Sequence, residues 1–305
     1  MQTPVAFFIF NRPSLTQQVF AAIARARPSR LLVVGDGPRG DHPNDAELVR
    51  DARRVIDQVE WPCEVVTCYS DFNLGCKRRV ATGLDWVFSQ VPEAVILEDD
   101  TLPDASFFPF CEELLARYRG DERVHMVSGF TIFEPGRFTE DSYYFSRCYH
   151  VWGWAGWARA WSHYDVEMRR WPEVRETRWL VELLGGEAEA RIAREIFDST
   201  YAGRVTTWDF QWVFSSWLRG GVSITPNANL VTNIGYGPLA TNERNSDHLV
   251  ARLGSYSVRF PLRHPCEVEI LQVADATEWR TAYPNYFPTD DASPLSRWRR
   301  ALGRR

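Results

Sequence analysis

The sequence predicts an α/β fold in which a mostly parallel sheet is sandwiched by helices. From the N-terminus to about residue 130, short apolar segments alternate with segments of helical periodicity. The short segments are continuously apolar, as expected for strands that are buried on both faces. Tryptophan-rich and helical stretches then replace this alternation. We expect one domain with two halves, 1–130 and 131–295, and a basic tail at 296–305.

The composition is that of a folded chain with a weak negative charge. The 305 residues include 35 Lys and Arg against 40 Asp and Glu, a formal net charge of −5, and 45% are hydrophobic. This balance disfavours a general nucleic-acid binder, which needs a basic surface. The longest apolar runs fall short of the roughly 20 residues that span a bilayer, and no signal-peptide pattern opens the chain. We therefore expect a cytoplasmic protein, whose six cysteines, lacking metal-ligand spacing, are reduced thiols.

Each element of the first half has its own local signal. Apolar and β-branched runs predict strands at Val5–Phe10, Leu31–Val34, Glu64–Tyr69, Ala94–Leu97 and Val124–Phe130. Apolar residues three and four positions apart predict the intervening helices, within 14–23, 48–59, 80–88 and 107–118. Ser14, followed by Gln17, has the pattern of a capping box, and Asp104 is expected to cap the helix after Pro103.

The second half is predicted to contain fewer strands. A short strand is expected at Tyr143–Ser146 and helices near Glu187–Tyr201 and Trp208–Arg219. Val222–Thr225 predicts a late strand, and Pro226 suggests that this strand lies at an edge, because proline cannot donate to a ladder. From about residue 236 the chain is loop-rich, which is typical of a functional segment.

Three consecutive carboxylates, Glu98, Asp99 and Asp100, end the predicted strand Ala94–Leu97. Ligands bind at the carboxyl ends of strands in open α/β sheets. Adjacent carboxylates repel one another, whereas a hard divalent cation shared with phosphate oxygens requires one or two of them. The triplet therefore predicts a site for Mn²⁺ or Mg²⁺ and a diphosphate, and a solvated acidic turn is the alternative.

Further charged residues follow the neighbouring strands. Asp36 comes after the second strand between two glycines, where a backbone can approach a ligand closely. Arg12 follows the first strand, and Lys77, Arg78 and Arg79 open a helix. These cationic groups and the helix N–H groups are expected near a phosphate.

Tryptophan is unusually frequent, with 13 residues, many of them between Trp152 and Trp217. Its flat apolar face and single edge donor suit sugar rings, although each tryptophan can also be an ordinary core residue. Asp209 follows Trp208 in this aromatic region. A carboxylate among apolar groups tends to have a raised pKa, which suits a general base. A helix-capping role for Asp209 remains open as well.

Together these motifs resemble the nucleotide-sugar glycosyltransferases of the GT-A fold. The likeness is strongest to the N-acetylglucosaminyltransferase I family and to bacterial family-2-like glycosyltransferases, and it extends from about Pro4 to Thr225. Its parts are Pro4–Arg12, Val33–Gly37, Val95–Asp100 with Pro103–Phe108, Gly153–Trp154 with Trp157 and Trp161, and Trp208–Asp209. The strand followed by Glu-Asp-Asp, a proline and a pair of phenylalanines is the most specific part.

The resemblance implies an inverting, metal-dependent hexosyltransferase that moves a sugar from a nucleotide-sugar, a UDP-sugar by expectation, to a hydroxyl of a glycan or lipid-linked glycan. The implied site residues fall into four groups: Arg12, Asp36, Arg79, Glu98 and Asp99 for the nucleotide-sugar, Asp100 for the metal at the position of a DXD motif, Trp154 and Trp208 for the acceptor or sugar, and Asp209 as the catalytic base. Such an enzyme would act in bacterial surface polysaccharide biosynthesis.

The sequence also departs from the family pattern. Many GT-A enzymes bring a late histidine to the metal, but Thr232–Asn242 contains none and His248 is not clearly placed. The arginine-rich C-terminus is expected to be a solvated end or a weak contact to anionic lipid. Two rival functions remain, a sugar-phosphate nucleotidyltransferase and a non-catalytic carbohydrate-binding module. The first normally has a glycine-rich basic loop where this chain has Asn11–Ser14, and the second leaves the acidic triplet unexplained.

Overall fold

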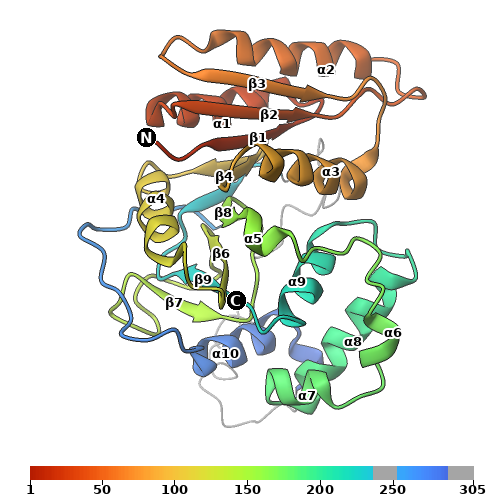
Figure 1. Ribbon diagram of the computed structural model, residues 1–305, viewed down its shortest axis with the longest axis vertical. Helices are drawn as coiled ribbons and strands as arrows, with labels where there is room; N and C mark the ends of the chain where they lie inside the picture. The colour runs from red at the N-terminus through yellow and green to blue at the C-terminus, as the bar shows by residue number, and fades with distance from the viewer. Residues whose placement is uncertain (236–252, 288–305) are drawn as a thin grey trace, which may run out of the picture.

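The computed structural model describes residues 1–235 and 253–287. An eight-stranded sheet in the order β3-β2-β1-β4-β8-β6-β9-β7 runs through the molecule (Figure 1). Its strands are β1 (Val5–Ile9), β2 (Arg30–Gly35), β3 (Glu64–Tyr69), β4 (Glu93–Glu98), β6 (Val124–Ser128), β7 (Tyr143–Ser146), β8 (Trp154–Trp157) and β9 (Val222–Pro226). All run in one direction except β8 and β7, whose ladders are antiparallel. The predicted fold class, a mostly parallel sheet between helices, is confirmed.

Helices cover both faces of this sheet. In the first half they are α1 (Pro13–Ala26), α2 (Asp45–Arg54) with the 3₁₀ turn η1 (Val55–Gln58), α3 (Gly75–Gln90) and α4 (Phe107–Tyr118). The second half contains α5 (Ala158–Trp161), α6 (Trp171–Val174), α7 (Trp179–Leu184), α8 (Glu187–Tyr201), α9 (Asp209–Trp217), α10 (Gln272–Ala282) and the 3₁₀ turn η3 (Pro284–Tyr286). Helices α6 to α9 gather beside one end of the sheet, and α10 lies next to β7 (Figure 1).

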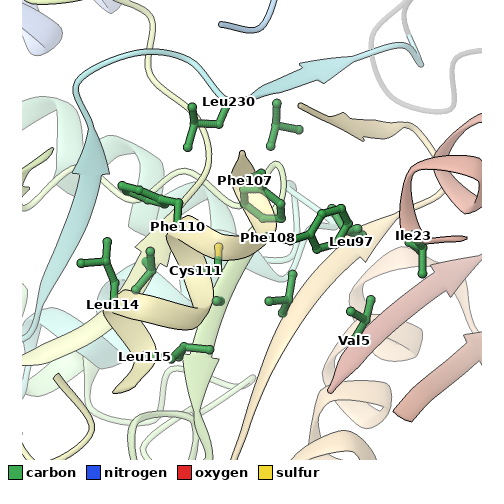
Figure 2. Packing of buried hydrophobic residues seen from close by; sticks show 14 of the residues in the cluster. Val5, Ile23, Leu97, Phe107, Phe108, Phe110, Cys111, Leu114, Leu115 and Leu230 are labelled. Atoms are coloured by element: carbon green, nitrogen blue, oxygen red, sulfur yellow. The ribbon is translucent and has the colours of Figure 1, made fainter. Parts of the chain in front are cut away.

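The alternation of side chains along β1 divides the core into two layers. Val5, Phe7 and Ile9 pack with α1 and α4, whereas Ala6 and Phe8 pack on the other face with α3. Figure 2 shows the first layer, in which the phenylalanines at the start of α4 lie beside Leu97 of β4. Because these central strands are buried on both faces, their ends have fixed positions, and the residues that follow them are held accordingly.

A second, two-stranded sheet builds the rim at the end of β4. It pairs β5 (Thr101–Pro103) with β10 (Val231–Asn233) in antiparallel register, Asn233 opposite Thr101. The N–H of Ile234 then donates to the carbonyl of Asp100 over 2.8 Å. A segment more than 100 residues away in sequence is thereby brought against the acidic triplet.

Three local predictions are wrong. Asp104 is not the cap of α4, because Ser106 is the N-cap residue and its N–H donates to Asp104 Oδ1 over 2.9 Å. Ser14 is not a cap, because α1 begins at Pro13, whose fixed φ suits the first helical position, and Arg12 is the N-cap residue. The strand containing Pro226 is not an edge strand, since β9 lies between β6 and β7. Pro226 is its last residue and pairs with Tyr143, at the end of the ladder, so proline interrupts no continuing strand.

Helix α10 lies in the part of the chain that the sequence predicts to be loop-rich. Asp275 accepts hydrogen bonds from Ser146 Oγ over 2.6 Å and from the Arg147 N–H over 2.9 Å. Glu278, one turn later, pairs with His150 Nε2 over 2.9 Å. The helix is therefore fixed to the end of β7 by polar contacts that span well over 100 residues of sequence. Among the described helices, none is long and apolar enough to cross a bilayer.

The junction of the two sheets around Gly129 tolerates no side chain. A methyl group there would lie 2.6 Å from both Phe107 and Val231 and 2.8 Å from the carbonyl oxygen of Gly153. We expect Gly129→Ala to lower the free energy of unfolding by about 1–3 kcal/mol through overpacking. Gly120→Ala is the matched control, because a methyl group at Gly120 meets nothing within 4 Å. Equal stability of the two variants in urea unfolding would contradict this packing.

Candidate active site

The acidic triplet lies at the carboxyl end of β4, but its three side chains have different surroundings. Asp99 is buried, and its Oδ2 accepts a hydrogen bond from the Phe10 N–H over 3.2 Å. Asp100 is partly exposed. Burial, followed by the repulsion of Asp100 and Asp99, raises the pKa of Glu98 to about 8. Burial also raises the pKa of Asp99 to about 6, although Arg12 opposes this shift.

Arg12 holds the triplet together. Its guanidinium donates to Asp99 Oδ1 and, over 2.8 Å, to Asp100 Oδ2. The side chain is only 13% exposed, so this is a largely buried ion-pair network. The two carboxylates keep the pKa of Arg12 above its usual value despite burial. The guanidinium, which the sequence predicts to lie near a phosphate, is thus already committed to two carboxylates.

Asp36, after β2, is fully engaged within the protein. Its Oδ1 accepts from the N–H groups of Gly37 and Leu74, both over 2.9 Å. Its Oδ2 accepts from Asn73 Nδ2 and from the Gly75 N–H, both over 3.0 Å. Since Leu74 and Gly75 form the start of α3, the carboxylate anchors the helix N-terminus. It also occupies two N–H groups, those of Leu74 and Gly75, at the helix start that the sequence predicts to lie near a phosphate.

A cavity of about 280 Å³, which we call the strand-end cavity, lies between these groups. It is formed by the ends of β1, β2 and β4, the start of α3, and the rim built by β10. Of the three basic residues that open α3, only Arg79 contributes to its wall, and Arg79 also donates to the carbonyl of Cys68. Arg39 reaches the cavity as well, held by Asp45 over 2.8 Å and lying over the Phe10 ring.

Asp209 is the first residue of α9. Its Oδ1 accepts hydrogen bonds from the Thr207 hydroxyl and from the Phe210 N–H, the latter over 3.0 Å. Burial raises the pKa of this carboxyl group above the usual aspartate value. Its charge also contributes, after burial, to the raised pKa values of Glu98 and Cys76, which both line the strand-end cavity. Asp209 is not the helix cap, because Trp208 is the N-cap residue of α9. The role of a base stays a prediction.

Asp209 belongs to a second cavity of about 510 Å³, which we call the helical cavity. Helices α8, α9 and α10 and the segment 147–152 between β7 and β8 form its walls. Trp152 lines both cavities. The cavity that contains the acidic triplet and the cavity that contains Asp209 therefore share one tryptophan in their walls.

The two tryptophans expected to contact sugar have other surroundings. Trp154 and Trp208 are 1% and 2% exposed and stack on each other in the core beneath α9. Neither lines either cavity. The tryptophans that line the helical cavity are Trp152, Trp217 and Trp279, of which Trp217 is itself buried, and phenylalanines and tyrosines complete its aromatic lining.

The donor set suits a divalent cation only when a ligand supplies further oxygens. Asp100 Oδ2 is held by Arg12, while Oδ1 has no hydrogen-bond donor among the described residues. The same part of the chain contains no group of three or more His, Cys, Asp or Glu side chains that could hold a metal ion. Mg²⁺ is commonly bound by one or two carboxylates together with substrate phosphates and water, and the single oxygen of Asp100 fits that type of site.

Several cavity residues were missed by the sequence analysis. Asn233 and Gly235 reach the strand-end cavity through β10, and a side chain at Gly235 would collide with Asp100 Oδ2 at 2.3 Å. Glu278 and Tyr283 reach the helical cavity through α10. Tertiary contacts bring these residues to the cavities, and no local sequence pattern predicts their positions. His248, most of the stretch 232–242 and the basic tail 296–305 lie outside the described residues.

Comparison with known proteins leaves the family open. No protein-family model matches the chain, and no curated protein sequence matches it either. Among solved structures, it is similar to the mannosyltransferase PcManGT from Pyrobaculum calidifontis in complex with GDP-Man and Mn²⁺, at 15% identity and a TM-score of 0.34, over 64% of this chain. The chain spans only 52% of the length of that structure.

Two other similarities are of the same low level. Mouse xyloside xylosyltransferase 1 in its apo form has 10% identity and a TM-score of 0.36, covering 70% of this chain and 81% of the other. A UDP-glucose pyrophosphorylase complexed with UDP-glucose has 12% identity and a TM-score of 0.27, covering 48% and 62%. At these scores the function must be argued from the chain's own residues.

The hydrogen bonds of Asp36 predict a structural effect of its removal. Asp36→Ala leaves the donors of Gly37, Asn73, Leu74 and Gly75 without their acceptor, and we expect a loss of about 2–4 kcal/mol in the free energy of unfolding. Urea unfolding measures this, and the exposed Asp71→Ala is the control, expected within about 0.5 kcal/mol of the parent. If Asp36→Ala kept its stability but lost nucleotide binding, the role expected from the sequence would be restored.

Proposed function

We propose that the protein is a metal-dependent, inverting glycosyltransferase that moves a sugar from a nucleotide-sugar to a hydroxyl of a glycan or glycolipid acceptor. One observation carries this proposal: a charged cavity at strand ends adjoins, at Trp152, an apolar cavity that contains a carboxyl group of raised pKa. The first half, 1–130, then provides the donor site, and the second half, 131–295, provides the acceptor site and the base. A UDP-sugar is our candidate donor, on the resemblance alone.

The donor diphosphate is assigned to the strand-end cavity. Asp100 would hold the divalent cation, with the diphosphate and water completing its coordination. When bound, the cation neutralises charge that develops on the departing diphosphate. Arg12 keeps Asp99 and Asp100 in position, and Arg79 and Arg39 add positive charge to the wall of the cavity. Glu98 and Asp99 line the same cavity, and we assign them to the donor ribose or sugar.

The chemical step is assigned to Asp209. Its Oδ1 is held by Thr207 and Phe210, so the carboxylate has a fixed orientation and Oδ2 remains to accept a proton. The acceptor hydroxyl gives its proton to Asp209 as its oxygen forms a bond to the anomeric carbon. The bond from that carbon to the diphosphate oxygen breaks, and the nucleoside diphosphate leaves with the electron pair. Attack opposite the leaving group inverts the anomeric configuration.

The biological setting is proposed on the resemblance alone. We place the reaction in the assembly of a bacterial surface polysaccharide or lipid-linked glycan at the cytoplasmic face of the membrane. Weak contact of the arginine-rich tail with anionic lipid would be compatible with that setting.

The single carboxylate oxygen at Asp100 predicts that metal and nucleotide bind together. Mn²⁺ alone should bind weakly, and UDP or GDP should increase its affinity strongly. Asp100→Asn should remove this increase and reduce turnover on the order of 10²-fold or more, since the metal supplies several kcal/mol of charge stabilisation. Calorimetry measures the binding, and Asp121→Asn, on the turn before β6, is the control. Full activity in the presence of a chelator would contradict the metal requirement.

The hydrogen bonds of Asp209 allow its chemical role to be tested apart from its structural role. Asp209→Asn retains an oxygen that can accept from Thr207 and Phe210, so the melting temperature and nucleotide binding should not change. A neutral amide cannot take up the acceptor proton, and turnover should fall by about 10²–10⁴-fold. The exposed Glu182→Gln is the control. Retention of the donor's anomeric configuration in the product, detected by NMR, would exclude single displacement.

The pH dependence of the reaction follows from the same carboxyl group. A base works only when it is deprotonated, so activity should be present above the pKa of Asp209 and lost as the pH falls through it. Burial raises that pKa, which places the acidic limb of kcat/KM above the value of about 4 typical of aspartate. An acidic limb at or below pH 4 would assign proton uptake to another group.

A further inference from the structure

We propose that the helical cavity selects acceptors in which the reacting sugar carries an apolar aglycone, either an alkyl chain or an aromatic ring. This inference rests on the proposed function, because it takes Asp209 as the group that meets the acceptor hydroxyl. It adds the chemical class of the acceptor, which neither the comparisons nor the acidic triplet indicate.

The lining of the helical cavity is mostly apolar and only half-buried. Ile196 of α8, Phe210 and Val213 of α9, and Trp279 of α10 are all partly exposed and all line it. Partly exposed apolar side chains that gather around one cavity gain stability when a ligand removes them from water. A volume of about 510 Å³ is in the range of cavities that enclose small organic ligands.

The course of α9 gives the cavity a direction. Asp209, Val213 and Trp217 are four residues apart and therefore lie along one face of the helix, and all three line the cavity. Eight residues correspond to a distance of about 12 Å along the helix axis. A sugar whose hydroxyl meets Asp209 therefore leaves apolar wall beyond it, around Val213 and Trp217, for the group attached to that sugar.

The charged residues of the cavity are compensated in part within the protein. His150 pairs with Glu278 over 2.9 Å. Asp275 offsets part of the charge of Arg147, whose Nη1 is buried without a hydrogen-bond partner. Asp209 is the remaining carboxyl group of the lining and lies beside the strand-end cavity. Most of the remaining lining is aliphatic or aromatic, and these walls favour an apolar aglycone.

The test compares matched acceptors that differ only in the aglycone. Methyl, hexyl and phenyl glycosides of glucose, galactose, mannose and N-acetylglucosamine are titrated into the full-length protein by calorimetry, with and without UDP and Mn²⁺. Each buried methylene should improve affinity about fourfold, so a hexyl glycoside should bind at least about tenfold more tightly than its methyl counterpart. The hexyl and phenyl series separate an alkyl from an aromatic preference.

Two substitutions locate the binding. Ala282→Trp places a large side chain at the exposed end of α10, in the wall of the cavity. It should reduce the affinity for hexyl glycosides about tenfold or more, the effect of excluding about two methylene groups. Binding of UDP should not change. Thr281→Trp is the matched control, because Thr281 is exposed on the same helix turn and does not line the cavity. Val213→Asp, halfway along α9, should reduce the preference for hexyl over methyl, and Val213→Ile should retain it.

The outcomes distinguish this inference from the proposed function. If the protein binds UDP with Mn²⁺ but binds hexyl, phenyl and methyl glycosides equally, the apolar acceptor is wrong and the glycosyltransferase proposal stands. If 1-hexanol binds as tightly as the hexyl glycosides, no sugar is recognised and the inference is also wrong. If hexyl glycosides bind selectively to a protein that binds no nucleoside diphosphate, the proposed function fails and the acceptor role fails with it.

Discussion

The candidate site depends on the compensation of buried negative charge by Arg12. Three carboxylates follow one another at the end of a strand that is buried on both faces, and two of them share a single guanidinium. A buried carboxylate without such a partner would be costly enough to take up a proton or distort the strand end. Because Arg12 directly follows β1, the neighbour of β4 in the sheet, the pairing needs no long excursion of the chain. The order of the strands therefore determines where the charged cavity can form.

Compensation of buried charge also explains the polar contacts of Asp36 and Asp45 in the first half. Asp36 uses both oxygens to hold the start of α3, and Asp45 holds Arg39 at the wall of the cavity. Asp36 accepts from N–H groups at the start of α3, and Asp45 neutralises Arg39, so neither carboxylate depends on water alone. Arg12, Arg39 and Asp45 thus have charges that are balanced within the protein, whereas the second oxygen of Asp100 stays available for a cation.

The sequence was most informative where local patterns decide the structure. Continuous apolar runs identified β1, β2 and β4, and the triplet at the end of β4 pointed to the correct edge of the sheet. Helix α10 has no strong apolar face and is held by Asp275 and Glu278 through contacts more than 100 residues away, so no local pattern reveals it. For Trp154 and Trp208 the sequence shows a clear signal, but the signal has two meanings. Tryptophan suits a sugar and a core equally well, and only packing shows that these two lie in the core.

The division between a charged and an apolar cavity also bears on how the two would work together. Asp209 lies where they meet, with a pKa raised by its burial, and the apolar walls around it are part of the reason for that burial. An acceptor with an apolar aglycone would exclude further water when it binds, and the carboxylate would become a stronger base. Under the proposed function the charged cavity would need to remain polar to hold a diphosphate, so one cavity could not meet both requirements. Two cavities that share Trp152 in their walls would allow the donor and the acceptor each to have its own environment.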